Sequence, residues 1–159
     1  MNILVAYATN SGGTADAANI VSTALTSGNH QVTTKMIHDV APDDLAAFDL
    51  ILFGSPSWDY QDKEGVPHED FIAFMEKMKG LPAGRQGKTL PNKNVAIFGL
   101  GDSSYTHFCG AVDHLEEFVK TLQGKLMSES LRIDGYYTHP GNQEKVKEWA
   151  EHLLQALTK

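Results

Sequence analysis

A short segment near the amino terminus, residues 8–14, combines three hydroxyl side chains with two glycines in the sequence A-T-N-S-G-G-T. It joins an apolar run to a helical pattern, and a helix N-terminus offers unpaired N–H groups and partial positive charge. Thr9, Ser11 and Thr14 add donors, so the segment suits a phosphate; the alternative is a tight turn with Thr14 as a helix cap. It lacks lysine and matches neither G-x-x-x-x-G-K-[ST] nor G-x-G-x-x-G. We therefore expect one monophosphate held mainly by backbone dipoles.

Two later segments place aromatic and acidic side chains after apolar runs. Residues 54–60 read as a polar loop that holds Trp58 and a tyrosine, and a flat ligand would give these rings a partner. The alternative is that Trp58 folds back over its own loop. Residues 99–105 repeat the arrangement with a glycine turn, Asp102 and Tyr105. Together the three loops can hold a phosphate and supply opposed aromatic faces around a planar ring.

The elements that position these loops alternate between apolar runs and helical patterns. The pattern predicts strands at 2–8, 30–37, 49–54 and 95–99, and a broken last strand within 125–134. It predicts helices at 14–25 with Gly28 as the stop, at 67–79, at 112–122, and from Asn142 as the cap of a final helix whose apolar face includes Trp149. Parallel strands need crossover helices, which cover both faces of the sheet. The expected fold class is α/β: a single doubly wound domain over residues 1–159, with a five-stranded parallel sheet flanked by helices.

Composition narrows the classes of function. The chain has 159 residues with a net charge of −7, which disfavours nucleic acid and anionic membranes as partners. No apolar run reaches the roughly 18 residues of a membrane span, and residues 1–10 show no targeting pattern. The one cysteine, Cys109, cannot form an internal disulfide and reads as a packed thiol. We expect a soluble cytoplasmic protein.

On these residues the sequence resembles the flavodoxins, small FMN-dependent electron carriers. The resemblance covers essentially the whole chain, is closest at residues 9–14, at Trp58 and at 99–113, and extends to 131–135 and 149–150. The last strand region lacks room for the long insertion of the larger subgroup, so the chain looks like a short-chain flavodoxin. The resemblance implies the strand order 2-1-3-4-5 and a non-covalently bound FMN.

The resemblance also assigns roles to residues. Residues 9–14 would hold the FMN phosphate, Trp58 and Tyr105 would enclose the isoalloxazine ring, and Asp102 would lie at its pyrimidine edge. The full set expected to contact the cofactor is Thr9, Asn10, Ser11, Gly12, Gly13, Thr14, Pro56, Ser57, Trp58, Asp59, Tyr60, Gly99, Leu100, Gly101, Asp102, Tyr105, Phe108 and Cys109.

The expected function is a low-potential one-electron carrier that shuttles between semiquinone and hydroquinone. The flavin carries the chemistry, and full reduction gives its ring a negative charge that an acidic site without cations disfavours. No catalytic residue and no metal is expected, and the chain is not an enzyme with its own substrate. The alternative is an NAD(P)H-dependent FMN or quinone reductase on the same fold, which needs room over the ring and usually a dimer.

Two positions, Asp59 and Pro56, depart from the family pattern. Asp59 stands where the family usually has a glycine whose peptide flips as the flavin nitrogen N5 gains a proton, and aspartate reaches positive φ less easily. Pro56 removes one N–H donor, and Tyr60 is a rival to Trp58 for the stacking role. Gly80 to Lys93 reads as a surface insertion or a partner-docking loop. As partners we expect redox proteins, such as reductases and oxidoreductases with basic docking surfaces, around a monomer.

Overall fold

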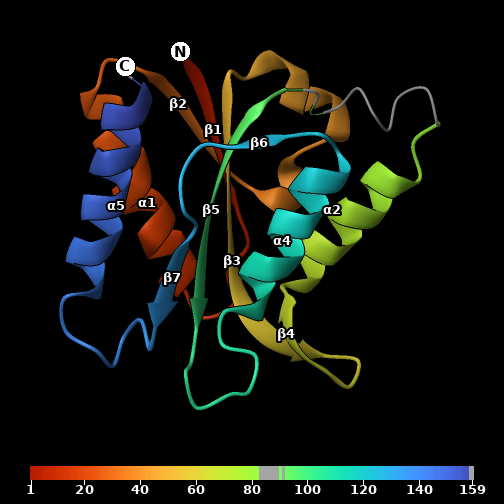
Figure 1. The fold of residues 1–159 in the computed structure, drawn as a ribbon, viewed down its shortest axis with the longest axis vertical. Coiled ribbons are helices and arrows are strands. Elements are labelled where there is room, and N and C mark those ends of the chain that lie inside the picture. Colours follow the sequence, from red (N-terminus) through yellow and green to blue (C-terminus); the bar gives the residue numbers. More distant parts are fainter. Residues whose placement is uncertain (83–89, 91, 158–159) are drawn as a thin grey trace.

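The computed structural model describes residues 1–82, 90 and 92–157 (Figure 1). Its strands are β1 Asn2–Tyr7, β2 Gln31–Met36, β3 Leu50–Tyr60, β4 Lys63–Pro67, β5 Asn94–Gly101, β6 Lys125–Leu126 and β7 Leu131–Asp134. Its helices are α1 Gly13–Ser27, α2 Glu69–Lys79, α4 Gly110–Thr121 and α5 Asn142–Leu157, with 3-10 turns η1 Ile37–Asp39 and η2 Pro42–Ala47. Among these residues no helix is long and apolar enough to cross a membrane.

The strands form one sheet in the order β2-β1-β3-β5-β6, with all of these neighbours parallel. This confirms the predicted fold class and the doubly wound order. The predicted count of five strands is wrong, because the described residues contain seven. The fifth position is divided: β6 pairs with the start of β5 and β7 with its end, both parallel. In addition, β4 pairs antiparallel with the end of β3.

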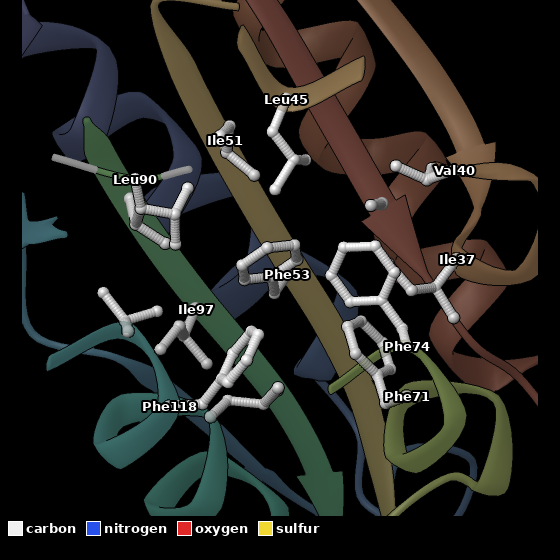
Figure 2. Close-up of a cluster of buried hydrophobic side chains, with 14 of the residues drawn as sticks. Ile37, Val40, Leu45, Ile51, Phe53, Phe71, Phe74, Leu90, Ile97 and Phe118 are labelled. Carbon is white, nitrogen blue, oxygen red and sulfur yellow. The ribbon is translucent and has the colours of Figure 1, made fainter. Parts of the chain in front are cut away.

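Helices cover both faces of the sheet, with α1 and α5 on one side and α2 and α4 on the other (Figure 1). The central strands β1, β3 and β5 are buried on both faces, which is why their sequences are continuous apolar runs. On the α2 and α4 side Phe53 is the centre of the core, and its ring lies 5.8 Å from Phe71, 6.3 Å from Phe74 and 6.4 Å from Phe118 between centroids (Figure 2). These contacts fix β3, and therefore the segment that follows it.

Residues 54–60 are not the loop that the sequence predicts. They belong to β3: residues 54–56 still pair parallel with β5, and residues 57–60 continue the strand beyond the parallel sheet. The chain then turns at Gln61 and Asp62, both at positive φ, into β4. The extension escapes prediction because outside the parallel sheet its residues are only partly covered and lose the apolar pattern of a buried strand. The next helix, α2, begins at Glu69 rather than Pro67, because Pro67 ends β4 and His68 caps the helix.

Asn142 holds the chain before α5 instead of capping the helix. Its side-chain amide donates to the carbonyls of Asp134, Gly135 and Tyr136 at 2.9, 3.1 and 3.3 Å, and its Oδ1 has no hydrogen-bond partner among the described residues. The segment that joins β7 to α5 is therefore fixed at its first residues. Most of the predicted insertion from Gly80 to Lys93 lies outside the described residues.

Candidate functional site

A cavity of about 580 Å³ opens at the carboxyl edge of the sheet, where the loops after β5 and β7 and the β3–β4 hairpin come together at the bottom of Figure 1. Of the predicted site residues, those that line it are Thr9, Asn10, Ser11, Gly13, Thr14, Pro56, Ser57, Trp58, Asp59, Leu100, Gly101, Asp102, Tyr105 and Cys109. Such a position follows from the rule that parallel α/β sheets bind ligands at the carboxyl ends of their strands.

Four predicted site residues do not line the cavity. Gly12 is the N-cap of α1 at φ 92°, a conformation that favours glycine. Gly99 packs against α4, because a Cβ there would lie 2.4 Å from Val112 Cγ2. Phe108 packs on the core of the α4 side, and the Tyr60 hydroxyl accepts from Gln61 Nε2 at 3.4 Å.

Seven further residues line the cavity that the sequence did not single out: Glu64, Gly65, His107, Gly135, Tyr136, Tyr137 and Thr138. The first two come from the unpredicted strand β4, and Glu64 Oε1 accepts the amide of His107 at 3.0 Å. The last four follow β7. Ligands bind at the carboxyl ends of the strands in such sheets, and applying this rule to the last predicted strand as well would have indicated these four residues.

The loop after β1 presents backbone donors to the cavity. Gly12 donates its amide to Thr9 Oγ1 at 3.0 Å, and its carbonyl accepts the amide of Asp16 at 3.0 Å to begin α1. The amides of Asn10, Ser11, Gly13 and Thr14 have no acceptor within the described part of the chain. The Thr14 side chain is only 2 % exposed, lines the cavity, and makes no hydrogen bond to a described residue. This arrangement is a set of neutral donors suited to an anion.

Two aromatic side chains line the cavity beside its acidic groups. Trp58 projects from the β3–β4 hairpin and stacks on His68, with ring centroids 6.3 Å apart and planes at 22°. Tyr105 lies in the loop after β5, in a turn where its amide donates to the Asp102 carbonyl at 3.1 Å, and it is 55 % exposed. The Trp58 ring does not fold back over its own loop but stacks on His68, the cap of α2, and its contact with a flat ligand stays a prediction.

The charge around the cavity is negative. Asp59, Glu64 and Asp102 line it, and no lysine or arginine does so within the described residues. Hydrogen bonds from Ser104, first its hydroxyl and then its amide, lower the pKa of Asp102, so this carboxylate is ionised at neutral pH. Arg132, behind Cys109, is bound to the Asp113 carboxylate at 2.8 Å. An added negative charge close to these three carboxylates is therefore electrostatically disfavoured.

Cys109 lies at the inner wall of the cavity in a fixed conformation. It is fully buried, has φ 51°, and its Sγ lies 3.8 Å from the Gly99 carbonyl and 3.7 Å from that of Ile133. Burial raises the pKa of the thiol to about 12, so it stays protonated. This confirms the packed thiol expected from the sequence.

Fold and site together define an α/β protein with a cavity at the carboxyl edge of its sheet whose lining suits a phosphorylated planar ligand. The family model for flavodoxin matches residues 5–149. The chain is 35 % identical over 158 residues to a flavodoxin of Nitratidesulfovibrio vulgaris, covering 98 % of this chain and 99 % of that one. It is also 35 % identical over 133 residues to a flavodoxin of Maridesulfovibrio salexigens, covering 83 % and 85 %.

A solved structure agrees with these relatives. The fold superposes on oxidised Flavodoxin 2 from Bacillus cereus with a TM-score of 0.83 and 28 % identity, covering 98 % of this chain and 99 % of that chain. The chain belongs to the flavodoxin family. It is an electron carrier that uses FMN, and not an enzyme that turns over a substrate of its own.

Proposed function

We propose that the cavity holds FMN non-covalently, with the phosphate at residues 9–14 and the isoalloxazine ring between Trp58 and Tyr105. The observation that carries this proposal is the convergence, on one cavity, of a loop with four unpaired amides and of two aromatic side chains, one from the β3–β4 hairpin and one from the loop after β5. A planar group that lay between the rings would be shielded from water on both faces.

The residues present fit this cofactor. A volume of about 580 Å³ lies within the range of roughly 300–1,000 Å³ for small-molecule sites. The phosphate loop is shaped by close approach as well as by donors, because a Cβ on Gly13 would lie 3.0 Å from Leu100 Cδ2 and 3.3 Å from Tyr136 Cδ1. Gly12 and Gly13 thus allow the backbone of the loop to approach its neighbours and a ligand.

Bound FMN supplies the redox chemistry, because its ring accepts and releases electrons one at a time. The chain supplies the environment that sets the energy of each step. Asp59, Glu64 and Asp102, with no lysine or arginine among the described lining residues, disfavour the charge that comes with the second electron. This charge distribution supports a low reduction potential for the second electron. Nothing in the comparisons favours the NAD(P)H-dependent reductase.

The family implies redox proteins as partners, and we further propose that these dock through basic surfaces onto the rim of the cavity. Asp59 and Asp102 are exposed there, and the whole chain carries a net charge of −7. Association driven by such charge weakens as salt rises. The proposed carrier is a monomer that works in the cytoplasm. Its buried Cys109 is a free thiol, which is the usual state of cysteine in a reducing compartment.

Titration of flavin-free protein with FMN, followed by quenching of flavin fluorescence, tests the site. Wild type should bind one FMN per chain. Trp58→Ala and Tyr105→Ala should each weaken binding by about tenfold or more, since base-type stacking on an aromatic ring contributes ~1–3 kcal/mol. Tyr60→Ala, outside the cavity, is the matched control that decides between the two candidates for stacking. An effect of Tyr60→Ala larger than that of Trp58→Ala would contradict the proposed ring site.

A further inference from the structure

Two consecutive tyrosines after β7 lie against the glycines of the phosphate loop, although more than 120 residues separate them in sequence. A Cβ on Gly12 would lie 3.4 Å from the Tyr137 hydroxyl, and a Cβ on Gly13 would lie 3.4 Å from Tyr137 Cε2. Both tyrosines line the cavity, and their rings meet edge to face with centroids 5.2 Å apart. The Tyr137 side chain therefore lies beside Gly12 and Gly13 of the loop, and the amide of Gly13 is one of those without a described acceptor.

The two tyrosines differ in what their hydroxyls do. Tyr136 donates to Asp16 Oδ2 at 2.5 Å, and the same carboxylate oxygen accepts Gln143 Nε2 at 2.8 Å. One carboxylate oxygen of Asp16, in the first turn of α1, therefore accepts two hydrogen bonds. The hydroxyl of Tyr137 has no hydrogen-bond partner among the described residues, and this ring is 66 % exposed. Tyr136 is a structural clamp, whereas Tyr137 is free to donate to a ligand.

The position of Tyr137 is fixed by its backbone. The amide of Gly135 donates to the Gly101 carbonyl at 2.9 Å, Gly135 itself turns the chain at φ 54°, and the Thr138 amide donates back to the Gly135 carbonyl at 2.9 Å. Asn142 adds its three donations to the same turn. A donor on this turn is held before a ligand arrives, so little ordering entropy opposes its use.

A second observation at the loop also points to a ligand. Thr14 lines the cavity and is only 2 % exposed, and its hydroxyl has no hydrogen-bond partner among the described residues. No lysine or arginine within the described residues lines the cavity, so an anion bound here depends on neutral donors. A phenol O–H is such a donor, and hydrogen bonds to charged acceptors are the stronger kind.

Resting on the proposed placement of FMN, we propose that the Tyr137 hydroxyl donates a hydrogen bond to the FMN phosphate and so makes the chain select phosphorylated flavin. The loop after β7 thereby becomes a fourth cofactor-binding segment, opposite residues 9–14.

The test compares the affinities of flavin-free protein for FMN and for riboflavin, which lacks the phosphate. Tyr137→Phe should reduce the preference for FMN by about tenfold, the low end of the range for a hydrogen bond to a charged group at an exposed site, with riboflavin affinity within about twofold of wild type. Tyr60→Phe makes the same chemical change outside the cavity and should leave the preference unchanged. Thr14→Val, with exposed Ser11→Ala as a second variant that does not disturb the helix, tests the loop itself.

The outcomes separate the two proposals. If Thr14→Val or Ser11→Ala lowers the FMN preference and Tyr137→Phe does not, the role of Tyr137 is overturned and the phosphate loop stands. If none of the three lowers it, the phosphate is not held at residues 9–14, and the proposed site fails together with the role of Tyr137. An equal loss for FMN and riboflavin in Tyr137→Phe would mean contact with the ring system and would also overturn the role.

Discussion

The rings of Trp58 and His68 stack with their centroids 6.3 Å apart and their planes at 22°. His68 is held from two sides: its amide donates to Ser55 Oγ at 3.0 Å, and its Nδ1 accepts the amide of Asp70 at 3.1 Å in the first turn of α2. Trp58 therefore rests on an anchored ring, and the aromatic wall of the cavity is coupled to the start of a core helix.

Replacing His68 should disturb both the helix and the aromatic wall. His68→Ala removes the cap acceptor and the stacked ring, and should lower the free energy of unfolding by about 1–2 kcal/mol in urea titrations. His68→Asn keeps a cap acceptor and should cost less stability, while shifting the emission of Trp58 as much as His68→Ala does. Trp149→Phe provides the background in which Trp58 is the only tryptophan. Unchanged Trp58 emission in both variants would contradict the supporting role of His68.

Asp59 should limit the separation of the two flavin reduction potentials. It sits where the pairing of β3 with β4 is irregular, and its φ is not positive. A peptide rearrangement that needs positive φ costs a non-glycine residue ~1–2 kcal/mol, so Asp59→Gly should widen the gap between the potentials by about 40–90 mV. Asp59→Asn removes the charge but keeps the side chain, and separates the two causes. The same gap in wild type and in Asp59→Gly, by anaerobic potentiometry, would refute the idea.

The carboxylates of the cavity should lower the potential of the second electron. Asp102→Asn should raise it, by on the order of 10–40 mV, since a charge is removed near a developing anion. Because the pKa of Asp102 is lowered, the difference from wild type should stay constant from about pH 8 to about pH 5 and disappear only in stronger acid, as pH falls through that lowered value. Glu144→Gln, the same change on exposed α5, is the control. An equal shift in the control would show a general effect of net charge.

Cys109 should be chemically silent in the folded protein. Its pKa is raised to about 12 by burial, so thiolate is scarce and a disulfide reagent should react at least about a hundredfold faster after unfolding than before. The sign of the linkage follows: the folded state favours the protonated thiol, so this contribution to stability is complete below pH 9.0 and is lost as pH rises toward about 12. Urea titrations of wild type and Cys109→Ala over this range measure it. Rapid labelling of folded protein would contradict the buried position.

The sequence predicted the parts of the site that follow from strand and helix periodicity. Residues 9–14 lie between a continuous apolar run and an amphipathic helix, so their place at a strand end could be read directly, as could the buried Cys109. Glu64 and Gly65 escaped because their strand β4 holds a glycine, a proline and charged residues in five positions. Tyr137 escaped for a different reason: its partner is Gly12, and a contact across more than 120 residues leaves no periodic trace.

Anaerobic reductive titration of the FMN-loaded protein, followed by visible absorption, tests the central claim that this chain carries electrons one at a time at low potential. The account predicts a long-wavelength band that rises to a maximum near half reduction and then falls, with the second electron entering at a clearly lower potential than the first. Direct conversion from oxidised to fully reduced flavin, with steady oxidation of NADPH by the pure protein, would contradict it and support a reductase.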